Sequence, residues 1–412
     1  MRLWLVNPFD PLPGDPEIPE VRYASLARAF ACNGHKVLWW TSNFNHRFKR
    51  FLDEKRITQV CKNVGIEIQF MDAIAYKKNV SLKRVLNHYL LAKNFSKMSR
   101  KLPLRPDVII ASTPPLMLAQ EAAKYAKENY VKLIVDTQDI WPEVFYPIFP
   151  KFLRPFASLL LRPWHTASKK AYQLADAYTC TAEEYLNHSQ QLGGKKKPFA
   201  VIPLGVDYQL FNNAASAGIC AEFKKPKGEI WFIYAGSITR NHDFLTPIHA
   251  FAEVYKSLKA PSKLFIVGAG YLSDLVKDAI GRYNTTKIMQ TGFLSMEKLA
   301  YLLTQCDIGF NASWPETRIF LPYRLFHYFA GGLAVLNTMP GECSQILKQN
   351  NCGLDYEAGN VDDCSRAINE VVSDLSRLRI MQVNSRNLAI NAYEQKVLYQ
   401  QYVKFIEDLI CT

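Results

Sequence analysis

The segment between residues 307 and 338 constrains the fold of this chain more than any other. Residues 307–312 form a short apolar run, and a polar loop follows. Pro322 then begins an amphipathic stretch, because proline suits the first position of a helix, and Gly332 ends it. Residues 334–338 predict the next buried strand. A strand, a helix and a strand in this order are typical of a parallel α/β sheet.

Two arginines, Arg318 and Arg324, flank the N-terminus of this predicted helix. They also follow the carboxyl end of a strand, which is where open α/β sheets bind ligands. The positive end of a helix dipole favours an anion at the same place. The pattern therefore predicts a pyrophosphate site.

This passage resembles the donor-site signature of glycosyltransferase family 4, the retaining nucleotide-sugar transferases of GT-B fold. The matching residues are Pro322, Arg324 (where the family often has lysine), Phe326, Tyr328, Ala330, Gly332, Val335, Gly341 and Glu342. The family's two glutamates, with seven residues between them, would fall on Ile319 and His327. The resemblance implies that position 327 lies beside the donor ribose, so we count His327 among the donor-binding residues. Pro322, at the N-terminus of the same predicted helix, is also counted among them.

Short buried strands alternate with helices twice along the chain, which predicts two doubly wound, Rossmann-like domains. The phrase V-I-P-L-G-V-D at 201–207 is similar to the family's interdomain linker, with Leu204 in place of asparagine. The resemblance implies a GT-B fold with two α/β domains facing across a cleft. Residues 1–203 would bind the acceptor and residues 204–390 the nucleotide sugar. Residues 391–412 would form a helix that returns to the first domain.

The stretch 233–243 reads as a strand, a glycine turn and a helix start. Gly236 would let the backbone approach a phosphate closely. The resemblance implies that Gly236 and Ser237 contact the donor and that Arg240 lies against its diphosphate. The alternative is that Arg240 is a surface residue after a turn.

Two later stretches also match the family. The V-G-A-G sequence at 267–270 lacks the third glycine of a dinucleotide fingerprint and is interpreted as a structural turn. The resemblance implies that backbone groups of Thr291, Gly292 and Phe293 read the nucleobase. Ser295 is expected to cap the next helix.

In the first half, Asp139 lies in D-I-W-P-E, similar to the family's R-D-L-W-P-E, with Gln138 in place of the arginine. Asp139 could accept a hydrogen bond from a sugar hydroxyl or stabilise oxocarbenium charge. The alternative is a cap for the following turn. Asn7, Gly14 and Thr113 lie at other strand ends and could line the acceptor side.

The net charge of +13 predicts an acidic partner. Residues 73–106 contain nine basic and no acidic residues, with apolar residues at helical spacing among them, and residues 151–170 are a second segment of this kind. Such segments suit an anionic membrane interface. The alternative is that their apolar faces are core. The aromatic residues follow core periodicity and no nucleic-acid recognition motif is present, so nucleic acid is not an expected partner.

The nine cysteines lack a C-x-x-C pair, which indicates reduced thiols in a cytoplasmic protein and neither a disulfide framework nor a zinc site. No apolar run is long enough for a transmembrane helix, and the first apolar run is too short for a secretory signal. A peripheral association with the cytoplasmic membrane is therefore expected. No D-x-D motif follows a strand, and neither a metal nor a cofactor is expected.

The resemblance implies a hexosyl- or N-acetylhexosaminyltransferase that uses a nucleotide-diphosphate sugar, expected to be a UDP-sugar, with retention. Its catalytic residues would be Asp139, Arg240 and Arg324, and Arg318 would bind the donor. The basic segments favour a lipid-linked saccharide acceptor in surface polysaccharide or glycan synthesis. Two alternatives remain, a GT-B-fold UDP-N-acetylhexosamine epimerase and a catalytically inactive nucleotide-sugar-binding protein.

Overall fold

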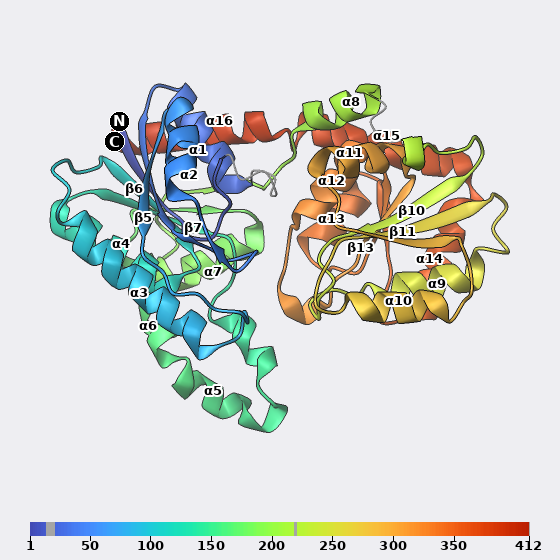
Figure 1. Ribbon diagram of the computed structural model, residues 1–412, viewed down its shortest axis with the longest axis horizontal. Coiled ribbons are helices and arrows are strands. Elements are labelled where there is room, and N and C mark those ends of the chain that lie inside the picture. Colours follow the sequence, from blue (N-terminus) through green and yellow to red (C-terminus); the bar gives the residue numbers. More distant parts are fainter. Residues whose placement is uncertain (14–20, 218–220, 412) are drawn as a thin grey trace. The chain divides into compact units, whose positions relative to one another are not determined.

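The computed structural model describes residues 1–13, 21–217 and 221–411. The chain divides into two compact units. Unit 1 is Met1–Pro203 with Leu398–Thr412, and unit 2 is Leu204–Val397. Each unit is built on its own sheet with helices against it (Figure 1).

The sheet of unit 1 has seven strands in the order β5-β2-β1-β6-β7-β8-β9, and its neighbouring strands pair in parallel. These strands are β1 (Arg2–Val6), β2 (Lys36–Ser42), β5 (Ile66–Met71), β6 (Val108–Thr113), β7 (Lys132–Thr137), β8 (Ala177–Cys180) and β9 (Phe199–Val201). A small antiparallel hairpin, β3 (Phe44–Asn45) and β4 (Arg50–Phe51), follows β2. Because parallel strands run the same way, the loops after β1, β2, β5 and β7 lie at one edge of the sheet.

The helices of unit 1 come mostly from the crossovers between these strands. They are α1 (Arg22–Cys32), α2 (Glu54–Asn63), α3 (Leu82–Ser99), α4 (Leu116–Asn129), α5 (Arg154–Leu160), α6 (Arg162–Leu174), α7 (Glu183–Gly193) and α16 (Gln395–Cys411). The short helices η1 (Glu143–Ile148) and η2 (Lys151–Leu153) precede α5. Helix α2 was not predicted from the sequence, although Ile57, Val60 and Cys61 have helical spacing, and neither was the hairpin, whose two strands have only two residues each.

The last helix, α16, packs on unit 1 through one apolar face. Tyr399, Tyr402 and Ile406 of this face are buried in the same core as Leu3 and Phe30. The C-terminal segment of unit 1 begins at Leu398. The sequence predicts that the returning segment begins at residue 391. Residues before it stay with unit 2, since backbone hydrogen bonds join Val206 to Tyr393 and Gln395.

The sheet of unit 2 has six parallel strands in the order β12-β11-β10-β13-β14-β15. They are β10 (Ile230–Ala235), β11 (Ser262–Val267), β12 (Ile288–Gly292), β13 (Ile308–Asn311), β14 (Ala334–Asn337) and β15 (Gly353–Asp355). The helices are α8 (Tyr208–Ala217), α9 (Leu245–Val254), α10 (Ser273–Gly281), α11 (Met296–Gln305), α12 (Tyr323–Gly331), α13 (Glu342–Gln349), α14 (Val361–Ser373) and α15 (Leu375–Asn391), with the turns η3 (Ala221–Phe223) and η4 (Pro315–Thr317). Ser295 caps α11 as predicted, because its hydroxyl accepts from the backbone N–H of Lys298.

None of the helices in the described ranges combines the length and the apolar character that crossing a bilayer requires. The cysteines that the structure describes are free thiols, and all but Cys32 and Cys411 are buried.

Candidate functional site

The N-terminus of α12 lies at the carboxyl edge of the sheet in unit 2. The backbone of Pro322 is extended (φ −75°, ψ 150°), so helical geometry begins at Tyr323, and Pro322 supplies no side-chain cap. Tyr328, one turn further on, holds the helix in place. Its hydroxyl donates to the carbonyl of Phe310 at 3.1 Å and accepts from the N–H of Ala235 at 2.9 Å. The helix is thereby fixed against the ends of β13 and β10.

Arg324 in the first turn of α12 is the central residue of this site. Its Nη2 donates to Oγ of Ser313 at 3.0 Å and lies 3.2 Å from Nδ1 of His242. Its guanidinium carbon lies 5.0 Å from the centre of the Tyr234 ring. Arg324 is only 7% exposed, and its Nε and Nη1 have no hydrogen-bond partner within the described residues. A buried cation with two unsatisfied donors is costly unless an anion joins it.

His242, which lies beside Arg324, is a neutral ring and does not change the charge of the site. Burial, followed by the repulsion of Arg324, lowers the pKa of His242 to about 3, so the ring is neutral at physiological pH. Its Nδ1 shares a hydrogen bond of 2.9 Å with Oγ of Ser313. His242 and Ser313 therefore fix the direction of Nη2 and leave the charge of Arg324 uncompensated.

Two glycine turns make room for this arginine. A Cβ on Gly236 would lie 3.3 Å from both Nη1 of Arg324 and the hydroxyl of Tyr234. Gly268 has a φ of +131°, and a Cβ there would lie 1.8 Å from the carbonyl oxygen of Gly236. The V-G-A-G segment therefore packs against the turn after β10, as the structural interpretation of it requires.

The other two predicted arginines are placed differently from Arg324. Arg240 is exposed on the loop after β10, where its backbone N–H donates to the hydroxyl of Tyr271 at 3.2 Å. Arg318 is exposed after η4 in a left-handed conformation (φ 53°). The two loops meet, because the N–H of Trp314 donates to the carbonyl of Asn241. Both loops leave the carboxyl edge of the sheet, where Arg324 lies at the start of α12.

The remaining predicted donor residues lie around this edge. Ser237 is exposed, and its carbonyl accepts from the hydroxyl of Tyr234 at 3.1 Å. Gly292, with a φ of +73°, accepts from the N–H of Gly268 at 2.8 Å, which links the end of β12 to the glycine turns. The Thr291 hydroxyl also donates to the carbonyl of Gly292, and the Phe293 ring is exposed.

His327 lies on α12 in an aromatic environment. Its ring centre is 5.9 Å from that of Phe211 on α8 and 6.3 Å from that of Tyr323. Burial lowers the pKa of His327 to about 4, so it is a neutral ring with one donor and one acceptor nitrogen. It cannot replace the charge of a glutamate at this position.

In unit 1, Asp139 is held within its own loop. One carboxylate oxygen accepts from the N–H of Ile140 at 3.0 Å and the other from Nε1 of Trp141 at 3.1 Å. Burial raises the pKa of Asp139 to about 6, against these two hydrogen bonds and the charge of Arg84, which lower it. This geometry favours the alternative that Asp139 organises the following turn.

The predicted acceptor-side residues have other partners. Thr113 is fully buried, and its hydroxyl bonds to that of Tyr172 at 2.9 Å, so the prediction that it faces a substrate is corrected. Asn7 is buried, and its side-chain oxygen accepts from the N–H groups of Phe9 and Asp10, so it shapes the loop after β1. Gly14 lies outside the described residues.

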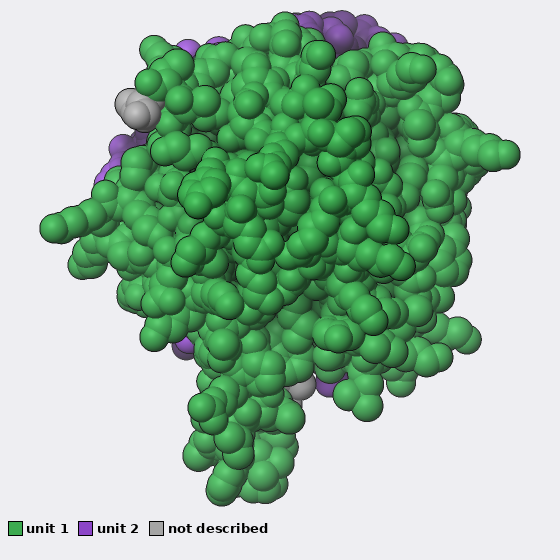
Figure 2. All heavy atoms as spheres, turned by 90° about the vertical axis from the view of Figure 1, so that its left-hand side faces the viewer, with its two compact units in different colours: residues 1–203, 398–412 green, residues 204–397 purple. Residues whose placement is uncertain are grey.

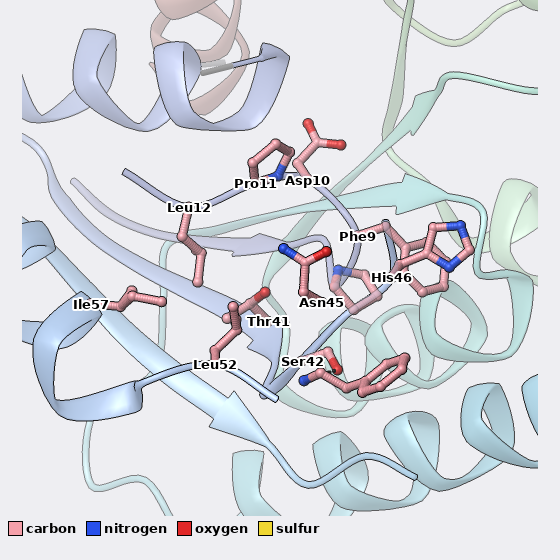
Figure 3. A pocket seen from close by; sticks show the side chains of 12 residues that line it. Phe9, Asp10, Pro11, Leu12, Thr41, Ser42, Asn45, His46, Leu52 and Ile57 are labelled. Carbon is pink, nitrogen blue, oxygen red and sulfur yellow. Dashed lines mark hydrogen bonds between the residues drawn. The ribbon is translucent and has the colours of Figure 1, made fainter. Parts of the chain in front are cut away.

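Two hollows stand out among the described residues, and Arg324 lines neither of them. The first, about 10 Å³, is large enough for one water molecule and lies at the carboxyl edge of the sheet in unit 1. Figure 3 shows Phe9 beside His46 at one end of it and the apolar side chains of Leu12, Leu52 and Ile57 at the other. The second is an open depression of about 500 Å³ at the start of α14, and its three carboxylates make it unsuitable for a diphosphate.

Sequence profiles of two families match the chain. The profile described as Glycosyltransferase Family 4 matches residues 19–210, and that described as Glycosyl transferases group 1 matches residues 219–388. The chain belongs to the family 4-like glycosyltransferases. This glycosyltransferase is 23% identical over 336 residues to a chitobiosyldiphosphodolichol beta-mannosyltransferase of Kluyveromyces lactis, covering 76% of this chain and 73% of that protein.

Solved structures show that this glycosyltransferase has the GT-B fold. Sucrose-phosphate synthase from Thermosynechococcus elongatus aligns with a TM-score of 0.74 at 14% identity, covering 100% of this chain and 99% of that chain. Anabaena HepE in complex with UDP aligns with a TM-score of 0.69 at 14% identity, covering 99% and 100%. The structure of WaaG, a glycosyltransferase involved in lipopolysaccharide biosynthesis, aligns with a TM-score of 0.64 at 11% identity, covering 98% and 99%.

The sequence did not identify Tyr234, His242 and Ser313 as members of the site. Ser313 directly follows an apolar strand, and His242 lies two residues after Arg240, so strand-end position was an available signal for both. No local pattern marks Tyr234, whose side chain lies beside Arg324 only because β10 and β13 are neighbours in the sheet.

Proposed function

We propose that this glycosyltransferase moves a sugar from a UDP-sugar, with retention of anomeric configuration, to a lipid-linked saccharide used in surface polysaccharide or glycan synthesis. The observation that carries the proposal is Arg324, a buried guanidinium at a helix N-terminus without a side-chain cap, two of whose donors have no partner in the part of the chain that the structure describes. A diphosphate satisfies both features, because it is a strong acceptor and carries the charge that a helix N-terminus favours.

In the proposed reaction the bond between the anomeric carbon and the diphosphate oxygen breaks, and the nucleotide leaves with the electron pair. The acceptor hydroxyl forms the new bond on the same face of the sugar, and its proton passes to the departing diphosphate. Arg324 and the dipole of α12 stabilise the negative charge that develops on the leaving group, which is the main catalytic effect we assign to the protein. Arg240 and Arg318, on adjoining loops, are proposed to approach the same diphosphate.

Similar proteins support the nucleotide and the acceptor in this proposal. The HepE structures contain UDP, and one contains UDP-glucose. The name of the Kluyveromyces lactis relative describes an acceptor with a diphosphate-linked lipid. We transfer both features to this chain as part of the proposal.

An exposed apolar segment of unit 1 supports membrane contact. Phe152, Phe156 and Leu159 on η2 and α5 are 75%, 69% and 69% exposed. Figure 1 draws α5 at the lower end of unit 1, and Figure 2 shows a narrow projection there. The sequence contains no carboxylate between Glu143 and Asp176, so the segment is complementary to anionic lipid.

The start of α3 adds to this surface. Leu82, Leu86 and Tyr89 are exposed, although the alternative interpretation expected them in the core. The buried face of α3 begins at Asn87 and His88 and continues through Leu91 and Phe95. We propose that these exposed residues and those of α5 bring the protein to an anionic membrane at the cytoplasmic face.

Nucleotide binding tests the proposed donor. Calorimetric titrations should show UDP binding more tightly than ADP, GDP or CMP. Arg324→Gln should weaken UDP binding by about tenfold or more, since hydrogen bonds to charged groups contribute about 1.5–3 kcal/mol. Arg282→Gln, which removes an exposed arginine at the end of α10, is the matched control and should bind UDP as the unmodified protein does.

Other results would identify an alternative. If no nucleotide binds, the proposed donor site is wrong. If GDP binds more tightly than UDP, the proposal of a UDP-sugar donor is wrong, but the proposal of sugar transfer still holds. Isomerisation of UDP-N-acetylhexosamine without an acceptor would indicate the epimerase, and UDP-sugar binding without turnover would indicate an inactive protein.

A further inference from the structure

A group of cationic and aromatic side chains occupies the carboxyl edge of the sheet in unit 1, and no role has yet been given to it. We call it the basic cluster. Its members come from the loops after β1, β2, β5 and β7 and from the first turns of α3: Phe9, His46, Lys49, Tyr76, Arg84, His88 and Trp141. This edge of a parallel sheet is where ligands bind.

Arg84 lies between two aromatic rings of the cluster. Its guanidinium carbon is 5.1 Å from the centre of the Trp141 ring and 5.8 Å from that of Phe9. Nη1 donates to the carbonyl of Asn79 at 2.9 Å, while Nε is buried and has no partner within the described residues. The rings therefore fix the plane of the guanidinium but do not neutralise its charge.

Lys49 holds a second positive charge beside the first. Its Nζ lies 4.6 Å from the centre of the Tyr76 ring and donates to the carbonyl of His46 and to the side chain of Asn79. Burial, and then repulsion from Arg84, lowers the pKa of Lys49 to about 8. Both cations thus share Asn79, although their charges repel each other.

No carboxylate within the described residues forms an ion pair with Lys49 or Arg84. The carboxylate of Asp139 attracts Arg84, but its two oxygens are held by its own loop. His46 and His88 are neutral rings. Burial and the neighbouring cations lower the pKa of His46 to about 2 and that of His88 to about 3. His88 is 3% exposed, and its Nε2 has no hydrogen-bond partner in the described chain.

We propose that the basic cluster binds a phosphate or diphosphate group of the acceptor. This inference rests on the proposed function and adds the residues of unit 1 that would recognise the phosphoryl group of the proposed acceptor. Two cations that form no ion pair with any described carboxylate match a phosphoryl group better than they match a neutral saccharide. Phe9 beside Arg84 is partly exposed and provides apolar surface for the parts of the acceptor attached to the phosphate, whereas Trp141 is buried and holds Arg84 in place.

The test is a calorimetric titration of the full-length protein with sodium pyrophosphate, with UDP present at saturation to fill the proposed donor site. We expect the unmodified protein to bind pyrophosphate. Arg84→Gln and Lys49→Gln should each weaken this binding by about tenfold or more. Lys83→Gln removes the same charge from an exposed position on the same turn of α3 and should leave the affinity unchanged. Urea unfolding of each variant checks that it folds. If Arg84→Gln is unstable, the pyrophosphate affinity of Lys49→Gln, a substitution on the hairpin loop, decides the test.

Pyrophosphate affinity that is equal in the unmodified protein and both cluster variants would overturn the inference. Vesicles of phosphatidylcholine distinguish a phosphate on the acceptor from a bilayer headgroup. If Arg84→Gln loses vesicle binding but keeps pyrophosphate binding, the cluster contacts the bilayer and the inference is wrong. If UDP does not bind but pyrophosphate binding still depends on Arg84 and Lys49, the phosphoryl site in unit 1 is supported. In that case only the proposed UDP donor is wrong.

Discussion

Arg22 and Asp136 form an ion pair with two hydrogen bonds in the core of unit 1, at 3.1 Å from Nε and 2.8 Å from Nη2. Both side chains are almost fully buried. Nη1 of Arg22 donates to the carbonyl of Ile202 at 2.8 Å, and the hydroxyl of Thr179 donates to Asp136 at 2.8 Å. Thr179 also bonds to the hydroxyl of Tyr402 at 2.7 Å. This network therefore joins α1, β7, β8 and α16.

Arg22→Ala should destabilise unit 1 strongly. The change leaves the carboxylate of Asp136 buried without its partner, and breaking such a pair typically costs about 3–5 kcal/mol. Urea unfolding followed by circular dichroism measures the loss. Arg56→Ala, which removes an exposed arginine on α2, should change the free energy of unfolding by less than about 0.5 kcal/mol. Equal effects of the two substitutions would show that the buried pair does not stabilise the unit.

Gly236→Ala should weaken UDP binding with little loss of stability. The new methyl group would lie 3.3 Å from Nη1 of Arg324, so the guanidinium must move by a few tenths of an ångström from its present position. We expect UDP affinity, measured by calorimetry, to fall several-fold. Gly281→Ala is the matched control, because a Cβ there meets nothing within 4 Å. UDP affinity that is the same in both variants would contradict the close approach of Gly236 to the donor.

Continuous apolar runs made much of the fold predictable. Ile230–Ala235 is apolar throughout, as a strand buried on both faces should be, and β10 has these bounds. The surface of α3 was less predictable. Leu82 and Leu86 have the spacing of a core face yet are exposed, while His88 and Asn87 are buried. Spacing indicates that residues share a face but not which face meets the sheet.

The candidate site was predictable only where one short segment supplies it. Pro322 and Arg324 lie in one motif, and their position at a helix N-terminus follows from that motif. Lys49 and Arg84 belong to different crossovers, and the order of strands in the sheet brings them together. The sequence placed Arg84 in a basic run but gave no sign that it lies between two aromatic rings.

His88→Phe should make unit 1 less sensitive to acid. The pKa of His88 is lowered by burial and by Arg84 to about 3 in the folded protein, whereas an unfolded histidine has a pKa of about 6.5. Below pH 6.5 the unfolded chain therefore binds a proton that the folded chain does not, and stability falls as the pH falls toward 3. Phenylalanine fits between the rings of Phe9 and Trp141 and cannot take up this proton.

Urea unfolding at several pH values checks this prediction. Between pH 6 and pH 4 the free energy of unfolding of the variant should rise relative to the unmodified protein by up to about 1.4 kcal/mol per pH unit. Between pH 7.5 and pH 8.5 the difference should stay constant, because His88 is neutral in both states. A difference that does not change with pH below 6 would mean that His88 is protonated in the folded protein.

Replacing Phe152, Phe156 and Leu159 together by serine should weaken binding to anionic vesicles. Each exposed side chain would contribute up to about 1.5–3 kcal/mol if the membrane buried it, so partial insertion of three predicts a loss of at least about tenfold. Sedimentation with vesicles of phosphatidylcholine and phosphatidylserine at low salt measures the bound fraction. The matched control replaces Leu375, Ile380 and Val383 by serine, since these residues are similarly exposed but lie on α15 in unit 2. The membrane surface proposed for unit 1 is wrong if both triple variants sediment equally, or if the unmodified protein stays in solution.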